Sequence, residues 1–77
     1  MNIHILTFGP VSDHVPGGPM EIPESLTVGQ LKERLHLEYP GLQPITYSVA
    51  VNRVMATDEQ ELKENAEIAL LPPFSGG

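Results

Sequence analysis

The first residues of the chain alternate in character, and a period of two residues is typical of a β-strand. Residues 2–9 read Asn-Ile-His-Ile-Leu-Thr-Phe-Gly, a run rich in β-formers that a Gly-Pro pair ends. The alternation places Ile3 and Ile5 on one face of the strand, and Leu6 and Phe8 on the other. We therefore predict a first strand with two distinct faces.

Other segments have the composition of strands and turns. Residues 10–19 are dense in proline and glycine, which indicates a hairpin-like loop. A β-branched, alternating run ends at Asn52-Arg53, which is predicted to turn the chain into a short strand. We therefore expect four further strands, at residues 20–22, 45–51, 54–55 and 67–71.

One helix is predicted to begin after Thr27. Thr27 and Gln30 have the spacing of a capping box, in which each side chain binds the backbone of the other residue. Leu31, Leu35 and Tyr39 then follow the three-to-four-residue period of one buried stripe. A Pro-Gly pair directly after Tyr39 is expected to end the helix.

The polar segment 57–65 is predicted to form a short helical turn, which Leu62 would pin to the core. Two strands, a helix, two more strands, this turn and a final strand are what a mixed sheet curled around one helix would produce. This α+β arrangement is the ubiquitin-like β-grasp, with about five strands around one main helix. We expect its first and last strands to lie side by side.

Composition limits the domains and the chemistry. The chain has 77 residues, of which 40% are hydrophobic, enough for one domain, which we assign to residues 1–71. There is no cysteine, which excludes disulfides, thiolate metal sites and a cysteine nucleophile. The histidines are too scattered for a metal site or a catalytic base, and we interpret His4, His14 and His36 as surface residues.

The charge of the chain favours basic proteins as partners. The formal net charge is -6, which argues against binding to nucleic acid or to an anionic membrane. Five of the ten acidic residues lie within residues 58–67, which form either a solvated face or a surface that steers docking. No basic leader or long apolar run is present, so we expect a cytoplasmic protein.

Residues 72–77 are predicted to form a flexible, extended C-terminal tail. Pro72-Pro73 ends the last strand, because proline cannot donate to a sheet ladder, and its fixed φ directs the tail away from the domain. At about 3.3 Å per residue the tail would reach about 20 Å. Gly76 and Gly77 lack a Cβ and leave the terminal carboxyl open to attack. A carboxylate is a poor electrophile, so an enzyme must first activate it, as an acyl-adenylate.

Three segments carry a resemblance to a known family. They are Leu-Leu-Pro-Pro-Phe-Ser-Gly-Gly at 70–77, Val-Ala-Val-Asn at 49–52 and Ala-Glu-Ile-Ala-Leu at 66–70. Together with the order of strands and helix, they resemble the small, sulfur-carrying subunit of molybdopterin synthase. In two places the chain departs from that family: Asn65-Ala66 replaces a frequent Gly-Asp, and Ser12-Asp13-His14 replaces a frequent arginine. Asparagine tolerates the left-handed turn, so the first departure is expected to preserve it.

The resemblance implies a carrier that is not an enzyme alone and binds no cofactor. An adenylyltransferase resembling ubiquitin activators would use ATP to adenylate Gly77, and a sulfur donor protein would convert it to a thiocarboxylate. The large subunit, in a heterotetramer of two small and two large subunits, would use that sulfur to build the dithiolene of molybdopterin from cyclic pyranopterin monophosphate. This is a step of molybdenum cofactor biosynthesis.

The resemblance also implies a partner surface on the sheet face opposite the helix. Leu6, Phe8 and Leu71 fall on that face, which Met55 would extend, unless the loop at 10–19 covers them. Phe74 either anchors in the partner's channel or folds back on its own sheet. The predicted partner-binding residues are Phe8, Met55, Leu71, Pro72, Pro73, Phe74, Ser75 and Gly76, and the reactive residue is Gly77.

Three other functions remain open at this point. A sulfur carrier for thiazole synthesis in thiamine formation would share the fold and the diglycine, but this chain resembles that carrier less around Pro72-Pro73. A ubiquitin-like modifier would instead join Gly77 to lysines of target proteins. A plain binding module would leave the tail unused.

Overall fold

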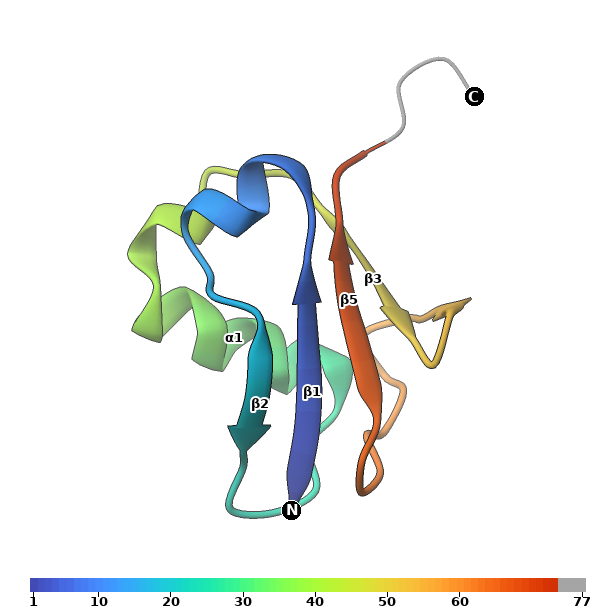
Figure 1. Cartoon of the computed structure of the whole chain (residues 1–77). Helices are drawn as coiled ribbons and strands as arrows, with labels where there is room; N and C mark the ends of the chain where they lie inside the picture. Colours follow the sequence, from blue (N-terminus) through green and yellow to red (C-terminus); the bar gives the residue numbers. More distant parts are fainter. Residues whose placement is uncertain (74–77) are drawn as a thin grey trace.

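The computed structural model describes residues 1–73 of the chain, and its elements are drawn in Figure 1. The strands are β1 (Asn2–Thr7), β2 (Gly18–Glu21), β3 (Ser48–Val51), β4 (Val54–Met55) and β5 (Glu67–Leu71). The α-helix is α1 (Val28–Glu38), and two short 3-10 helices are η1 (Gly9–Asp13) and η2 (Pro40–Leu42).

The five strands form one mixed sheet in the order β2-β1-β5-β3-β4. β1 and β5 run parallel, paired from His4 with Glu67 to Thr7 with Leu70, whereas the other neighbouring strands are antiparallel. The predicted pairing of the first and last strands is therefore confirmed, and so is the β-grasp arrangement around one helix. As a result, the strand that leads into the tail occupies the middle of the sheet.

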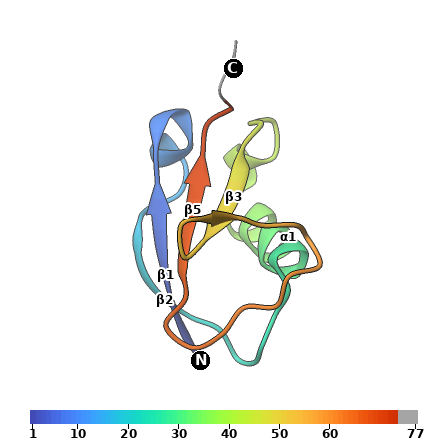
Figure 2. The same ribbon diagram turned by 90° about the vertical axis from the view of Figure 1, so that its right-hand side faces the viewer.

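The hydrophobic core lies between the sheet and α1, which covers one sheet face only (Figure 2). The alternation in the strands predicted the buried side: Ile3 and Ile5 are each 2% exposed, whereas His4 between them is exposed. The strand residues of this core are Ile3, Ile5, Val49, Val51, Ile68 and Leu70, and the helix adds Val28, Leu31 and Leu35. Among residues 1–73, no helix covers the opposite sheet face.

The start of α1 confirms the predicted capping box. The Thr27 hydroxyl accepts a hydrogen bond from the Gln30 N–H at 3.2 Å, and the Gln30 side chain accepts one from the Thr27 N–H at 2.9 Å. The helix ends at Glu38, one residue before Tyr39 and the Pro-Gly pair. These local signals determine the position of the helix along the chain.

The segment at 57–65 contains no helix, which corrects the prediction of a helical turn, and makes separate turns, one of them closed by the Gln60 N–H, which donates to the Thr57 carbonyl at 3.2 Å. The carbonyls of Asp58 and Gln60 each accept a hydrogen bond, at 2.9 Å, from the first backbone N–H groups of α1. This contact holds the segment along the start of the helix and satisfies donors that helices leave unpaired. The predicted anchor is nevertheless confirmed, because Leu62 is 1% exposed.

The segment after β1 also differs from the predicted hairpin-like loop. It begins with η1 and buries Val11 and Val15, at 0% and 2% exposure, in the main core. Prolines and glycines around these two valines interrupt any regular apolar period. The sequence pattern therefore did not predict that the valines join the core. The segment is part of the core and does not simply connect two strands.

The predicted strand limits need three corrections. β1 ends at Thr7, two residues early, and β2 spans Gly18–Glu21 instead of residues 20–22. β3 begins at Ser48 instead of Ile45, because Ser48 pairs with the last residue of its neighbour β5. Pro72 directly follows Leu71, the last residue of β5, and has no N–H that could continue the ladder.

Candidate functional site

The C-terminal tail leaves the domain from the middle of the sheet. β5 lies between β1 and β3, and its last residue, Leu71, leads directly to Pro72 and Pro73 (Figure 1). Pro72 is half-buried against Gly9, where an added Cβ would lie 3.4 Å from the Pro72 Cγ. Gly9 has a φ of 60°, which side chains rarely allow. Sequence reasoning did not single out Gly9, although the Gly-Pro pair after the first strand was a signal.

The reactive end of the tail lies outside the described residues. Phe74, Ser75, Gly76 and Gly77 therefore keep the roles that the sequence predicts for them, and the two interpretations of Phe74 both stay open. The structure describes the base from which these residues continue: a central strand, a half-buried Pro72 and an exposed Pro73.

The sheet face without a helix carries a row of apolar residues that crosses four strands. The register pairs Leu6 with Ala69, Ala69 with Ala50, and Ala50 with Met55, so all four residues share one face. The two alanines were not predicted as site residues, although the alternation of their strands already placed them there. The row joins β1, β5, β3 and β4 at their outer surface.

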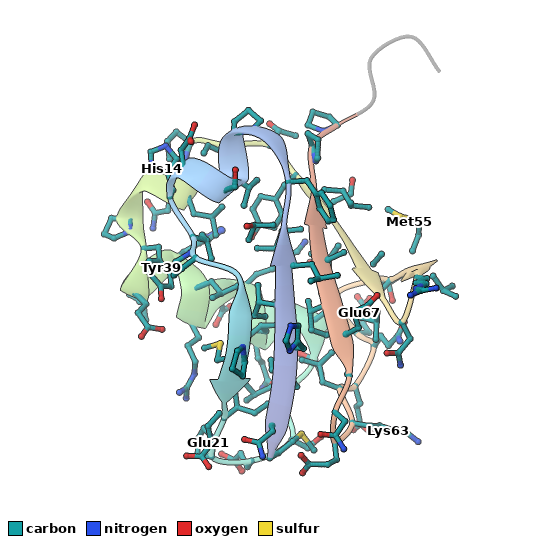
Figure 3. All side chains as sticks on the ribbon, viewed as in Figure 1. His14, Glu21, Tyr39, Met55, Lys63 and Glu67 are labelled. Atoms are coloured by element: carbon teal, nitrogen blue, oxygen red, sulfur yellow. The ribbon has the colours of Figure 1, made fainter. Side chains whose placement is uncertain are left out.

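Two more predicted residues lie on this face nearer the tail. Leu71 is half-buried on the outer side of β5, and Phe8 directly follows β1 and is 46% exposed. Met55, at the β4 edge of the sheet, is 60% exposed (Figure 3). The structure thus brings the predicted Phe8, Met55 and Leu71 to one side. We call this surface the outer-face patch. Its half-buried or exposed members are Leu6, Phe8, Met55, Ala69 and Leu71, and it includes Ala50, which is only 5% exposed.

The predicted alternative, that loop 10–19 covers this surface, does not hold for Phe8. The loop directs Val11 and Val15 into the main core between sheet and helix, and Phe8 keeps nearly half of its surface exposed. Away from the tail, the patch borders Glu67, whose Oε1 lies 3.6 Å from the Arg53 Nε. An apolar centre with a polar border is the usual anatomy of a protein–protein interface.

A polar cluster on another side of the molecule connects α1 with Tyr47, just before β3, and with Asp58 of the segment at 57–65. His36 Nε2 and the Tyr47 hydroxyl are 2.8 Å apart, and Lys32 Nζ lies 2.8 Å from Asp58 Oδ1. Burial, with a smaller contribution from Asp58, raises the pKa of Tyr47 to about 12. His36 is therefore a half-buried, hydrogen-bonded residue, which corrects its interpretation as a surface residue.

The rest of the described structure offers little other chemistry. His4 and His14 are exposed, as predicted. Within residues 1–73, no group of three potential ligand side chains could hold a metal ion. In the same part of the chain, no helix has the length and apolar character to cross a membrane.

Comparison with known proteins identifies the family. The profile of the ThiS family matches residues 8–77. The chain belongs to the ThiS family. The molybdopterin synthase sulfur carrier subunit of Arabidopsis thaliana is 31% identical to this chain over 65 residues, which cover 82% of this chain and 68% of that protein. These matches confirm the resemblance to the sulfur-carrying subunit of molybdopterin synthase, which was based on residues 49–52, 66–70 and 70–77.

Solved structures confirm the fold of this ThiS-family protein. A putative molybdopterin converting factor subunit 1 from Pyrococcus furiosus matches with a TM-score of 0.86 and 19% identity, over 96% of this chain and 99% of that one. Small archaeal modifier protein 1 of Haloferax volcanii matches with a TM-score of 0.79 and 18% identity, over 95% of this chain and 98% of that one. One chain of a complex of subunits 1 and 2 of the molybdopterin-converting factor from Helicobacter pylori matches with a TM-score of 0.73 and 24% identity, over the whole of this chain and of that one.

Proposed function

We propose that this ThiS-family protein is the cytoplasmic sulfur carrier subunit of a molybdopterin synthase and that its reactive group is the Gly77 carboxyl. The observation that carries the proposal is the tail's starting point, in the middle of the sheet and beside the outer-face patch. A partner that binds the patch would receive the tail in a defined direction. The relationship to a curated sulfur carrier subunit supports the same role.

The chemistry begins with activation of the terminal carboxylate. Its oxygen attacks the α-phosphorus of ATP in an activating enzyme, so that pyrophosphate leaves and Gly77 becomes a glycyl adenylate. A nucleophilic sulfur of a donor protein then attacks the acyl carbon, and AMP leaves with the electron pair of the broken C–O bond. With a persulfide as the donor, this step gives an acyl disulfide. A thiolate then attacks the donor-side sulfur, so that a new disulfide forms there and the S–S bond breaks to release the Gly77 thiocarboxylate.

The outer-face patch and the tail would together deliver this group to the large subunit. Phe8, Leu71 and Met55 would bind that subunit, and residues 72–77, at about 3.3 Å each, would reach about 20 Å into its active site. The Helicobacter pylori complex of two converting-factor subunits supports a large-subunit partner. We expect two small and two large subunits per complex, and two carriers used per dithiolene, because each carrier brings one sulfur.

Reconstitution from purified components tests the proposal. Thiocarboxylated protein, the large subunit and cyclic pyranopterin monophosphate should together form molybdopterin, detected as its fluorescent oxidation product. The same protein with a plain carboxylate is the matched control and should form none. If no molybdopterin appears while thiazole synthase accepts the sulfur, the protein is instead the carrier for thiamine formation.

A ubiquitin-like modifier would give a different experimental result from a sulfur carrier. The likeness to small archaeal modifier protein 1 concerns the fold, which a modifier and a carrier share. Attachment of Gly77 to target lysines, seen as isopeptide-linked peptides in cell extracts, would assign the chain to the modifiers if it occurred without molybdopterin formation. A Gly77 that is never activated in cells would leave only the plain binding module.

A further inference from the structure

The contact between β1 and the tail continues beyond the last residues of the two strands. β1 and β5 run parallel, and the last pair in their register is Thr7 with Leu70. Two residues further along both segments, the same register brings Gly9 beside Pro72. A Cβ added at Gly9 would lie 3.4, 3.5 and 4.0 Å from the Cγ, Cβ and Cδ of Pro72. The proline ring therefore covers the position where any other residue would carry its side chain.

The backbone at Gly9 is held in place by η1. Gly9 has a φ of 60°, and its carbonyl accepts a hydrogen bond from the Ser12 hydroxyl at 2.6 Å. Val11 is completely buried, and its carbonyl accepts a hydrogen bond from the Val15 N–H at 2.9 Å. η1 also lies against β5, the strand that continues into the tail (Figure 1). Gly9 thus belongs to the packed domain, and Pro72 rests on a well-held surface.

The direction in which the tail leaves the domain depends on this contact. Proline has no N–H for the ladder, and its ring fixes φ but leaves ψ free. Pro72 is half-buried whereas Pro73 is exposed, so packing against the domain decreases from the first proline to the second. A change of about 20° at Pro72 would move the end of an extended tail of about 20 Å by about 7 Å. A misplacement of about 1 Å is already enough to slow a reaction between positioned groups.

We propose that Gly9, held by Ser12, is a positioning residue for sulfur delivery, because the surface it leaves free of a side chain holds Pro72 and sets the direction of the tail. This inference rests on the proposed function, since direction matters only where the tail enters a partner's active site. Phe8, next to Gly9, belongs to the outer-face patch. The same turn therefore joins the docking surface to the base of the tail, and a large subunit bound to the patch meets the tail at a constant angle.

A spin label on the tail tests the positioning without any activity. The chain has no cysteine, so Ser75→Cys gives the full-length protein a single labelling site. Paramagnetic broadening of domain amides should be concentrated on one group of neighbouring residues. Gly9→Asn and Ser12→Ala, each made in the labelled protein, should spread the broadening over more residues and lower its maximum. An unchanged pattern in both variants would overturn the proposal.

The Gly9→Asn variant is designed to fold while it displaces the ring. Asparagine tolerates the left-handed conformation, so the turn should form. Its Cβ would already reach van der Waals contact with the ring, and the amide beyond it competes with the ring for that space. Ser12→Ala is the second variant, which loosens the turn without adding atoms near Pro72. Thermal unfolding verifies that both variants are folded.

Single-turnover sulfur transfer at saturating large subunit measures the effect on delivery. Thiocarboxylated Gly9→Asn should react about fivefold more slowly, the factor expected for ordering one freed backbone residue. Ser25→Ala is the matched control for Ser12→Ala, because the Ser25 hydroxyl also donates to a backbone carbonyl, that of Leu62, at 3.1 Å. Ser25 lies between β2 and α1, and its variant should react at the wild-type rate. Equal rates for Ser12→Ala and Ser25→Ala would contradict the role of Ser12.

A double-mutant cycle separates positioning from a general effect on the turn. Gly9→Asn combined with Pro72→Ala should be about as slow as Pro72→Ala alone, because both changes remove the same contact. If Gly9→Asn adds its full loss to that of Pro72→Ala, Gly9 does not act through Pro72 and the proposal is wrong. If the wild-type protein forms no molybdopterin, the proposed function fails instead, and the spin-label pattern still decides whether Gly9 directs the tail.

Discussion

Two adjacent leucines at the end of β5 separate the core from the interaction surface. Leu70 is completely buried beneath α1, whereas Leu71 is half-buried on the opposite sheet face, beside Phe8. Both have the same side chain, and only the alternation of the strand places them in different surroundings. Substitutions at these two positions should therefore affect different properties of the protein.

At the residue scale we predict that Leu71→Ala or Phe8→Ala weakens the complex with the large subunit by one to a few kcal/mol, roughly the range for central apolar anchors. Titration calorimetry measures this loss. The free energy of unfolding should change little, whereas the control Leu70→Ala should lower it by about 2–5 kcal/mol. Wild-type binding by Leu71→Ala, combined with strong destabilisation, would show that Leu71 belongs to the core.

Tyr47 should make stability depend on pH in the alkaline range. Its pKa is raised from 10.0 to about 12 in the folded protein, so between these values the unfolded chain releases a proton that the folded protein keeps. The contribution of Tyr47 to the free energy of unfolding is therefore fully present below pH 10 and is lost as the pH rises toward 12. Urea unfolding across this range should show a shallower decline for Tyr47→Phe. Parallel declines for the two proteins would mean that Tyr47 is not responsible.

At the scale of elements, sequence prediction succeeded where the signal is local. The capping box of Thr27 and Gln30 and the stripe of Leu31 and Leu35 determine α1 without reference to distant residues. The segment at 57–65 failed the same reasoning, because its conformation depends on hydrogen bonds to the start of α1, about thirty residues earlier in the chain. Composition alone could not reveal that partner.

The capping box gives a direct test of the local signal. Thr27→Ala removes the side-chain acceptor for the Gln30 N–H and should lower the free energy of unfolding by about 1 kcal/mol. Thr46→Ala, at an exposed position outside any helix or strand, is the control and should change it little. Urea denaturation measures both. Equal effects would indicate a general loss at threonine positions and no capping contribution.

The stiffness of the tail is the second element-scale prediction. Replacing Pro72-Pro73 by two glycines frees backbone that proline restricts, at an ordering cost of about 1 kcal/mol or more per residue. Molybdopterin formation should therefore slow, while adenylation of Gly77 should slow less. Rates of both reactions, measured on the same preparation, check this. An equal or larger loss in adenylation would place the role of the prolines in activation instead of delivery.

At the scale of the whole molecule, the order of elements was enough to predict the β-grasp fold and the face that α1 leaves open. The outer-face patch followed for Phe8 and Leu71, because the alternation of β1 and β5 was visible. Met55 belongs to a strand of two residues, which has no alternation of its own. A cavity of about 380 Å³ between β2 and the C-terminal half of α1 did not follow, since Val15, Met20 and Leu35 come together only through tertiary packing. The buried Val11 and Val15 were missed for the same reason.

The central claim is that Gly77 carries sulfur, and intact-mass spectrometry of the protein isolated from its own cells tests it most directly. Deletion of Gly77 provides the control: it should leave thermal unfolding unchanged, because the tail follows the last core strand, yet abolish ATP-dependent adenylation. The full-length protein is predicted to contain a population in which sulfur replaces one terminal oxygen. A protein that carries only the plain carboxylate in cells making molybdopterin, or a truncated chain still adenylated at its new end, would contradict the account.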